Sequence, residues 1–438
     1  MPEPLQTAKY IEALMHLDPV RVNGKVTQVI GLTVESEGPD AKIGDVCHIF
    51  PSRSRRPVIA EVVGFRDNKV LLMPLGDLEA VGPGCDVVNT GKPLTVRVGH
   101  ELLGKVLDGL GQPLDGTLLP ERMPRYAAHQ APVNPLKRPR VLEPISVGVR
   151  CIDGLLTIGK GQRVGIFAGS GVGKSTLLGM IARNTSADVN VIALIGERGR
   201  EVLDFIERDL GAEGLARSVV VVATSDQPAL IRIKGAQIAT SIAEYFRDRG
   251  LDVMLMMDSV TRYAMAMREV GLAIGEPPAT RGYTPSVFAN LPKLLERSGT
   301  GPKGSITAFY TVLVDGDDMN EPIADAVRGI LDGHIVLSRD LANKGHYPAI
   351  DVLSSVSRVM TEIVSAEQLA AAEKLKSLLS VYKSSEDLIN IGAYQRGANP
   401  QIDMAIEYIQ KIQDFTRQGI MEKVTFEESR NLLIEQFS

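Results

Sequence analysis

A glycine-rich stretch between a strand and a helix constrains the fold of this 438-residue chain more than any other feature. Residues 163–167 form an apolar run that predicts a buried strand, and residues 177–182 are apolar and favour a helix. The residues that join them are Ala168, Gly169, Ser170, Gly171, Val172, Gly173, Lys174, Ser175 and Thr176. A strand, a glycine-rich turn and a helix in this order predict a phosphate-binding loop, or P-loop.

The residue types in this loop predict a site for the polyphosphate of a nucleotide. Glycines let successive backbone N–H groups turn toward an anion, and the N-terminal end of the next helix favours the same charge. Lys174 can supply a positive charge to the β- and γ-phosphates, and Ser175 a hydroxyl to Mg²⁺. Ala168 stands where the strict pattern has glycine. An ordinary strand-to-helix turn is the alternative, and the run Gly-Lys-Ser-Thr disfavours it.

The composition is that of an ordinary globular protein. Hydrophobic residues make up 44% of the chain and charged residues 23%, and the formal net charge is -5. This balance offers no basic excess that would favour nucleic acid as a partner. No apolar run approaches the ~20 residues that span a bilayer, and the first residues do not read as a signal peptide. We expect a cytoplasmic protein in which Cys47, Cys85 and Cys151 are reduced, buried thiols.

The N-terminal part has the pattern of a small β-barrel. Residues 20–98 contain short β-rich runs separated by Gly, Pro and Asp, at 25–34, 45–49, 58–65, 70–74 and 94–98. Several short strands in so few residues favour closure into a barrel. Residues 1–19 form a separate N-terminal segment, in which 5–17 have the apolar spacing of a helix. Packing on its own domain and docking to another protein are both open for this segment.

The remainder divides into a P-loop domain at 99–363, with a turn-rich lead-in at 99–150, and a helical domain at 364–438. From residue 152 apolar runs alternate with helical stretches, which is typical of a parallel sheet covered on both faces. Strands are expected at 189–195, 219–222, 253–257 and 306–314, and helices at 199–209, 228–248, 259–272, 285–297 and 321–333. Near the C-terminus, Thr425 and Glu428 predict a capping box that opens the last helix.

Two carboxylates follow strands of the expected sheet. Asp258 comes after the run 253–257, and Glu197 after the run 189–195. Ligands of such sheets lie outside the carboxyl ends of the strands, so both side chains can reach a nucleotide on the P-loop. There Asp258 can hold Mg²⁺ through its water shell, and Glu197 can orient or deprotonate an attacking water. Taken alone, Asp258 reads as a helix N-cap and Glu197 as a surface residue.

Two residues near the end of the P-loop domain are also candidates for the site. Arg358 lies where the sheet gives way to helices, and its planar guanidinium suits a charged phosphoryl group. Tyr347 precedes Pro348, which favours an extended backbone that can present the ring to an adenine. From the residues alone, a structural salt bridge for Arg358 and core packing for Tyr347 are the favoured alternatives.

These motifs together resemble the catalytic subunits of rotary ATP synthases and, more closely, the flagellar export ATPases of the type III secretion family. The shared motifs are the P-loop, Gly196-Glu197-Arg198, Asp258-Ser259-Val260-Thr261-Arg262-Tyr263-Ala264, Tyr347-Pro348-Ala349-Ile350-Asp351 and Ser357-Arg358. Sequence motifs typical of the export ATPases occur at 150–156, 275–280, 282–288, 309–314 and 330–339. The resemblance extends from about residue 20 to the C-terminus.

The resemblance implies an α/β fold, namely a RecA-like P-loop NTPase sheet with an N-terminal β-barrel and a C-terminal helical domain. It implies an ATPase that forms a homohexameric ring, with nucleotide sites between subunits. The residues carried over to the ATP and Mg²⁺ site are Gly169, Ser170, Gly171, Val172, Gly173, Lys174, Ser175 and Thr176 for phosphate, Ser175 and Asp258 for the metal, Glu197 for water, Arg198 and Arg262 for the γ-phosphate, Tyr347 for adenine, and Arg358 for the neighbour's site.

The resemblance also implies partners and a location. Residues 275–285 match a loop that faces the ring's pore, and the helical domain would face the stalk and the cargo. The partners implied are a stator-type regulator dimer, a central stalk protein, the membrane export gate and complexes of export substrates with chaperones. The location implied is cytoplasmic, at the periphery of the inner membrane export apparatus.

Three other functions are open to a chain with these motifs. An ATPase of a virulence-type secretion system, or injectisome, would share all the catalytic residues. An RNA-dependent ATPase or translocase is disfavoured by the net negative charge and by the barrel, which lacks interleaved basic and aromatic residues. A non-catalytic nucleotide-binding subunit is disfavoured by Glu197, because such a subunit should lack the carboxylate that activates water.

Overall fold

The computed structural model describes residues 22–51, 56–78, 80–314 and 318–438. The expected helix at 5–17 lies outside these residues. The chain forms two compact units, Met1–Leu94 and Thr95–Ser438, and each is described by itself.

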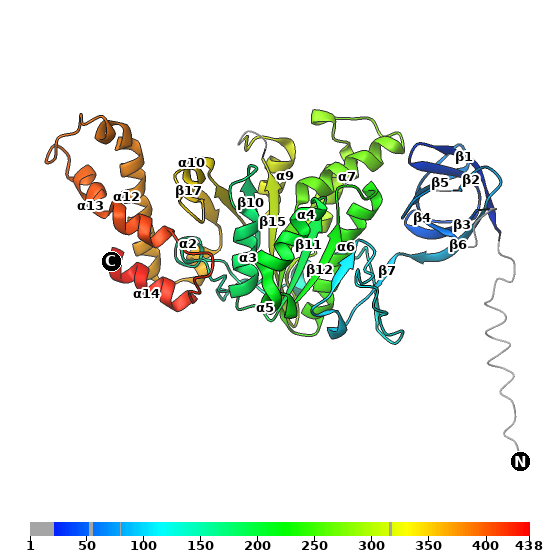
Figure 1. The fold of residues 1–438 in the computed structure, drawn as a ribbon, viewed down its shortest axis with the longest axis horizontal. Helices are drawn as coiled ribbons and strands as arrows, with labels where there is room; N and C mark the ends of the chain where they lie inside the picture. Colours follow the sequence, from blue (N-terminus) through cyan, green and yellow to red (C-terminus); the bar gives the residue numbers. More distant parts are fainter. Residues whose placement is uncertain (1–21, 52–55, 79, 315–317) are drawn as a thin grey trace, which may run out of the picture. The chain divides into compact units, whose positions relative to one another are not determined.

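In the described part of the first unit, six strands close into the expected barrel, in the order β1-β2-β5-β4-β3-β6 (Figure 1). They are β1 (Gly24–Ile30), β2 (Thr33–Glu37), β3 (Asp45–Phe50), β4 (Val58–Arg66), β5 (Lys69–Pro74) and β6 (Asp86–Pro93). The interior is apolar because alternate side chains point inward, with Val34, Ile49, Val62, Leu72 and Val87 fully buried.

Two expectations for the barrel strands are wrong. The run at 25–34 is two strands, because Gly31 has a φ of +56° and turns the chain so that Ile30 pairs with Thr33. The run at 94–98 does not belong to the barrel: β7 (Thr95–Arg97) pairs with β9 (Arg125–Ala127) in the second unit. The barrel is closed instead by β6, which pairs with β1 and β3.

The second unit is built around the expected parallel sheet, which has nine strands among the residues that the structure describes. The order is β17-β16-β10-β15-β13-β11-β12-β8; β17 is antiparallel to β16, and β14 pairs antiparallel with β15. The strands are β8 (Val106–Asp108), β10 (Arg163–Ala168), β11 (Val189–Ile195), β12 (Ser218–Ala223), β13 (Asp252–Asp258), β14 (Gly299–Thr300), β15 (Ser305–Leu313), β16 (Gly333–Leu337) and β17 (Ile350–Ser357). All the predicted central strands are confirmed, and the sheet also contains β8, β14, β16 and β17, which were not predicted.

Helices pack on both faces of this sheet (Figure 1). Every residue of β11 and β12 is therefore buried. The α-helices are α3 (Lys174–Asn184), α4 (Gly199–Asp204), α5 (Gly211–Ala216), α6 (Ala229–Asp248), α7 (Val260–Ala273), α8 (Pro285–Leu295), α9 (Pro322–Ile330) and α10 (Arg339–Asn343). A π-helix, η3 (Phe205–Leu210), continues α4, and short 3-10 turns are η1 (His100–Leu102), η2 (Pro135–Lys137) and η4 (Thr280–Gly282). The helix expected at 321–333 ends at Ile330, because Leu331 is extended and Gly333 begins β16.

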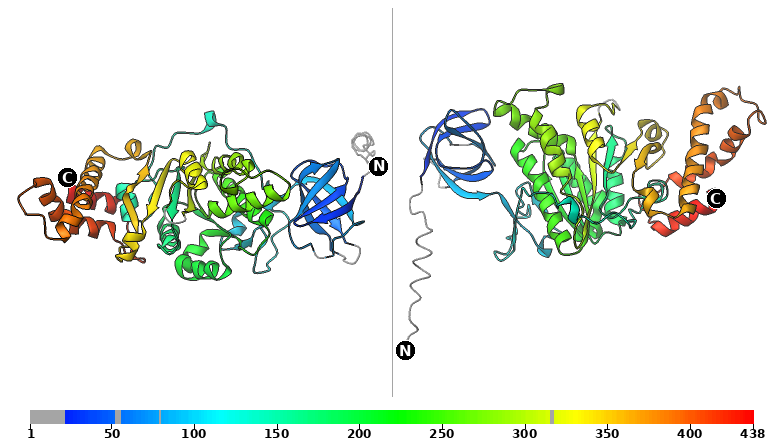
Figure 2. Two further views of the ribbon diagram at one scale, coloured as in Figure 1. Left: turned by 90° about the horizontal axis from the view of Figure 1, so that it is seen from above. Right: turned by 180° about the vertical axis from the view of Figure 1, so that it is seen from behind.

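The C-terminal helices pack beyond the sheet edge formed by β16 and β17 (Figure 2). They are α11 (Met360–Ile363), α12 (Ala366–Asn390), α13 (Pro400–Thr416) and α14 (Phe426–Phe437), and they enclose α2 (Arg150–Leu155). The capping box of Thr425 and Glu428 is confirmed. Phe415 and Phe437 extend the apolar core of the sheet into this part of the unit. None of the helices in the described residues has the length and apolar character needed to cross a membrane.

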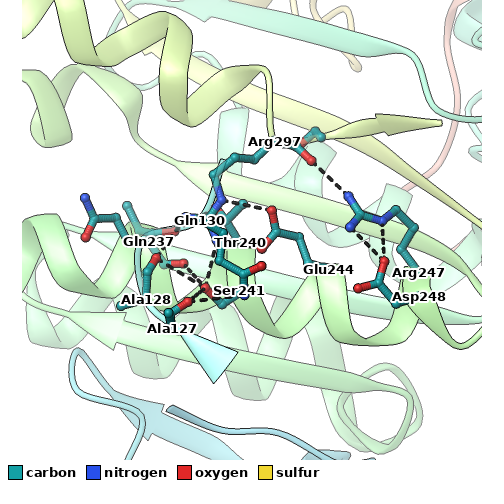
Figure 3. Close-up of polar contacts among 12 residues, drawn as sticks. Ala127, Ala128, Gln130, Gln237, Thr240, Ser241, Glu244, Arg247, Asp248 and Arg297 are labelled. Carbon is teal, nitrogen blue, oxygen red and sulfur yellow. Dashed lines mark hydrogen bonds and ion pairs between the residues drawn. The ribbon is translucent and has the colours of Figure 1, made fainter. Parts of the chain in front are cut away.

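The lead-in segment is fastened to the domain by a buried network around Arg297 (Figure 3). The guanidinium of Arg297, which is 1% exposed, donates to both carboxylate oxygens of Glu244 on α6, at 2.9 and 2.7 Å. It also donates to the carbonyl of Ala128, and the Ser241 hydroxyl donates to the carbonyl of Ala127. The turn-rich segment therefore lies over the domain that follows it, as expected.

Candidate active site

The P-loop connects the end of β10 to the first turn of α3. Gly171 and Gly173 have φ angles of +79° and +88°, in the left-handed region where glycine is strongly favoured. Gly173 is the N-cap of α3, so the helix begins at Lys174. The N-terminal end of an 11-residue helix thus lies directly behind the loop, where it favours an anion.

Lys174 lies between the two carboxylates that the sequence placed at strand ends. Its Nζ is 2.6 Å from Oδ1 of Asp258 and 3.5 Å from Oε1 of Glu197. The three side chains converge because β11 and β13 are neighbours in the sheet and end at the same edge. Burial disfavours the charge of Lys174, but the two carboxylates outweigh burial and raise its pKa.

Glu197 is the group in this cluster whose protonation is most altered. Burial, followed by the charge of Asp258, raises its pKa to about 7, although Lys174 acts in the opposite direction. A hydrogen bond with Glu201 raises it further. Gly196 permits this arrangement, since its φ is +74° and a Cβ there would lie 2.7 Å from Cβ of Arg262. A carboxylate with a pKa near neutrality can accept a proton during catalysis.

A cavity of about 440 Å³ lies beside the P-loop. Arg198 and Arg262 are among its lining residues. Arg262 on α7 has a buried Nε with no hydrogen-bond partner among the residues described. Arg198 is exposed and forms an ion pair with Glu201 at 2.5 Å. A buried N–H group without a partner is rare in folded proteins, so Arg262 is suited to an anionic ligand.

Tyr347 lies on the other flank of the P-loop. A Cβ at Gly173 would be 3.3 Å from Cε1 of Tyr347, so the ring lies against the loop. A second cavity of about 480 Å³ includes Tyr347, Arg417 and Gln418 among its lining residues. The backbone N–H of Gln418 donates to the carbonyl of Tyr347 at 3.1 Å, which ties this wall to the helices at the C-terminus. A half-exposed ring in this place can stack on a flat heterocycle.

Arg358 is the one predicted site residue that the structure separates from the others. It follows β17, which runs antiparallel to β16, and its N–H donates to the carbonyl of Asp332 beside the first residue of β10. The P-loop begins at the opposite end of β10, roughly 17 Å away along the strand. The Arg358 side chain is exposed, and among the residues that the structure describes it donates to the carbonyl of Arg328, at 3.4 Å. It therefore lies outside the nucleotide site of its own chain.

Two side chains of the cavity region are not among the residues predicted from the sequence. The Thr311 hydroxyl on β15 donates to Oδ1 of Asp258 at 2.7 Å, and Glu201 joins Glu197 to Arg198. The sequence does not single out Thr311, because β15 also carries the hydroxyls of Ser305, Thr307 and Tyr310. Glu201 is not related to Glu197 by helical spacing, because Glu197 precedes α4, which begins at Gly199.

The residues present fit a divalent cation of the magnesium type. The hydroxyl of Ser175 and the carboxylate of Asp258 are hard oxygen ligands, which Mg²⁺ prefers, and few protein ligands suffice when phosphate supplies others. The P-loop, the carboxylates at two strand ends and the arginines together define a P-loop nucleotide hydrolase.

Comparison of the chain with known protein families supports this class of protein and narrows it to one family. The nucleotide-binding domain of the ATP synthase alpha/beta family matches residues 148–357, and the β-barrel domain of that family matches residues 26–91. The C-terminal domain of the type III secretion ATPase EscN matches residues 364–435.

The relatives are similar over nearly the whole chain. The flagellum-specific ATP synthase of Bacillus subtilis is 60% identical over 426 residues, which is 97% of each chain. The type 3 secretion system ATPase of Xanthomonas euvesicatoria is 52% identical, over 94% of this chain and 93% of that protein. The assembled ATPase EscN of enteropathogenic Escherichia coli superposes with a TM-score of 0.89 at 48% identity, covering 95% of this chain and all of that one. The chain belongs to the family of flagellar and type III secretion ATPases.

Proposed function

We propose that this protein hydrolyses ATP with Mg²⁺ to energise protein export by a flagellar type III apparatus. The observation that carries the proposal is the convergence of Lys174, Glu197 and Asp258 beside the P-loop. The flagellum-specific ATP synthases among the relatives supply the physiological context.

The residues of the P-loop and its helix bind the nucleotide. Backbone N–H groups of residues 169–176 hold the phosphates, and Lys174 leaves Asp258 for the β- and γ-phosphates when ATP arrives. Ser175 and Asp258 hold Mg²⁺, which neutralises charge on the phosphates when it is bound. Tyr347 stacks its ring on the adenine.

The chemical step is assigned to Glu197 and the arginines. Glu197 orients the attacking water and takes its proton, for which a pKa near 7 is well matched. Arg198 and Arg262 meet the γ-phosphate, where charge develops as the bond to the leaving group breaks. Arg358 acts on the nucleotide of a neighbouring subunit, since it lies at the far end of β10 from its own P-loop.

Such a site requires an assembly, and we propose a homohexameric ring. Support comes from the assembled form of EscN and from its complex with the central stalk EscO, which covers 95% of this chain at 47% identity. A stalk protein of that kind is the first proposed partner. The family resemblance adds a stator-type regulator dimer, the export gate and cargo–chaperone complexes, at the cytoplasmic face of the inner membrane.

The domain limits 20–98, 99–363 and 364–438 also stay predictions.

An injectisome ATPase is the second candidate, because type 3 secretion relatives are 52% and 50% identical. The flagellar relatives reach 60%, 55% and 53%, which favours the flagellar system. Expression of the protein in a strain that lacks its own flagellar export ATPase should restore swimming. Failure to do so, combined with rescue of a secretion mutant, would favour the injectisome.

Two variants test the catalytic assignment. Lys174→Ala should weaken ATP binding as well as turnover, because Lys174 meets phosphate before the reaction. Glu197→Gln should bind ATP like the wild type and turn over at least about 100-fold more slowly, since the amide cannot accept a proton. Titration of both proteins with a fluorescent ATP analogue, beside steady-state hydrolysis, separates the two roles. Equal loss of binding in both variants would contradict the role given to Glu197.

A further inference from the structure

Thr311 makes a contact with Asp258 that none of the proposed catalytic roles uses. The Thr311 side chain is fully buried on β15, and its hydroxyl lies 2.7 Å from Oδ1 of Asp258 and 3.3 Å from the carbonyl oxygen of Met257. A hydroxyl has one hydrogen, and the shorter contact to a carboxylate is the stronger of the two.

We propose that Thr311 is a positioning residue for the divalent cation: its hydroxyl holds the carboxylate of Asp258 in the orientation that binds Mg²⁺ together with ATP. The proposal rests on the metal role of Asp258 in the proposed function. It adds a residue that touches neither nucleotide nor metal and acts through another side chain, as the hydrogen-bond partners of metal ligands do.

Asp258 needs such a partner because Lys174 leaves it for the phosphates when ATP binds. Without nucleotide, Oδ1 of Asp258 has two partners, Lys174 Nζ at 2.6 Å and Thr311 Oγ1 at 2.7 Å. When Lys174 turns to the phosphates, the hydroxyl is the partner that remains. Asp258 is buried, so a carboxylate with neither partner would be poorly oriented and poorly stabilised.

The pairing of β15 with β13 holds Thr311 beside Asp258. Strands β13 and β15 pair in parallel from Asp252 with Ser305 to Met257 with Tyr310, so Thr311 is level with Asp258 one step further on. Beyond it, the N–H of Leu313 donates to the Thr261 hydroxyl on α7 at 2.9 Å. Hydrogen bonds thus join the end of β15 to the end of β13 and to α7, the helix that follows β13.

The inference is tested by variants that separate the hydroxyl from the shape of the side chain. Thr311→Val keeps the shape and loses the hydroxyl, and Thr311→Ser keeps the hydroxyl. We expect Thr311→Val to weaken Mn²⁺ binding, measured by electron paramagnetic resonance with a non-hydrolysable ATP analogue, by about 10-fold or more. Binding of the same analogue in EDTA should stay within about twofold of wild type. Thr311→Ser should restore the metal affinity.

Two results would overturn the inference. One is a Thr311→Val protein with the metal affinity of the wild type. The other is an equal loss of analogue binding with metal and in EDTA, which would show a general disturbance of the pocket. Should the valine protein fail to fold, Thr311→Ala and Thr311→Ser make a second pair that differs only by the hydroxyl, and the same ratio of metal affinities is expected between them.

Asp258→Asn separates this inference from the proposed function. If it leaves Mn²⁺ affinity unchanged, the metal role of Asp258 fails, and the role of Thr311 fails with it. If Asp258→Asn weakens metal binding and Thr311→Val does not, only the role of Thr311 is refuted. Loss in both variants, with rescue by serine, supports the inference.

Discussion

Glu197→Gln should stabilise the nucleotide-free protein while it abolishes turnover, and the stabilisation should depend on pH. The reason is that the folded protein binds a proton at Glu197 more tightly than the unfolded chain does. Burial, with the charge of Asp258, raises the pKa from 4.5 to about 7. Between these values the folded state holds more protons, so stability falls as pH rises and stays low above pH 7.

The size of the effect follows from the same two pKa values. The difference corresponds to about 3 kcal/mol of lost stability above pH 7 and to less than about 1 kcal/mol at pH 5. Glutamine cannot ionise, so the variant should regain that amount at pH 8 and little at pH 5. Its amide also keeps a hydrogen-bond donor for Glu201, as the protonated carboxyl does.

The assay is urea unfolding of the nucleotide-free protein at pH 5 and pH 8. Circular dichroism is a suitable probe, because the chain has no tryptophan. Glu207→Gln is the matched control: this carboxylate is exposed on η3, and its replacement should change the midpoint little at either pH. An equal shift for Glu197→Gln at both pH values, or a lower midpoint at pH 8, would refute the reasoning.

Two further substitutions test the P-loop and the Arg297 network. Gly173→Ala should raise the KM for ATP well above the value for Gly171→Ala, since both positions have a left-handed φ but only Gly173 has the Tyr347 ring within 3.3 Å; equal KM values would contradict that packing. Arg297→Met should lower the free energy of unfolding by about 3–5 kcal/mol, because it leaves Glu244 buried and unpaired, and the double variant with Glu244→Met should lose less. Urea unfolding at pH 7 measures the free energy of unfolding of the single and the double variant. A double variant that is less stable than Arg297→Met would contradict this explanation of the Arg297–Glu244 ion pair.

The sequence predicts best what is decided locally. The strands β10, β11, β13 and β15 are largely apolar runs, so their existence follows from pattern alone. The P-loop follows β10, Glu197 comes directly after β11 and Gly196, and Asp258 ends β13, so the place of these residues in the site also follows from the sequence. Glu197 and Asp258 were placed correctly at one edge because parallel strands end together.

What depends on pairing across the sheet could not be read from the chain. The contact of Thr311 with Asp258 is set by the register of β13 and β15, which are more than 50 residues apart in sequence. The position of Arg358 depends on β17 running antiparallel to β16, a direction that no local pattern specifies. The closure of the barrel by β6 was missed because Gly91 and Pro93 make this stretch resemble a turn.

In the proposed mechanism, Arg358 of a neighbouring subunit completes each active site. Arg358→Ala should lower turnover by about 10³–10⁵, roughly 4–7 kcal/mol of activation barrier, with a much smaller change in ATP binding. Glu197→Gln should be inactive for a different reason, since its own site lacks the carboxylate.

Mixing these two inactive proteins tests whether Arg358 acts across the interface between subunits. Where an Arg358→Ala subunit supplies an intact Glu197 and its Glu197→Gln neighbour supplies an intact Arg358, the interface contains every catalytic group. We predict that ATPase activity partly returns in the mixture, while each protein alone stays inactive at the same total concentration. A mixture that forms mixed rings, as shown by cross-linking of differently tagged subunits, and yet remains inactive would contradict the account.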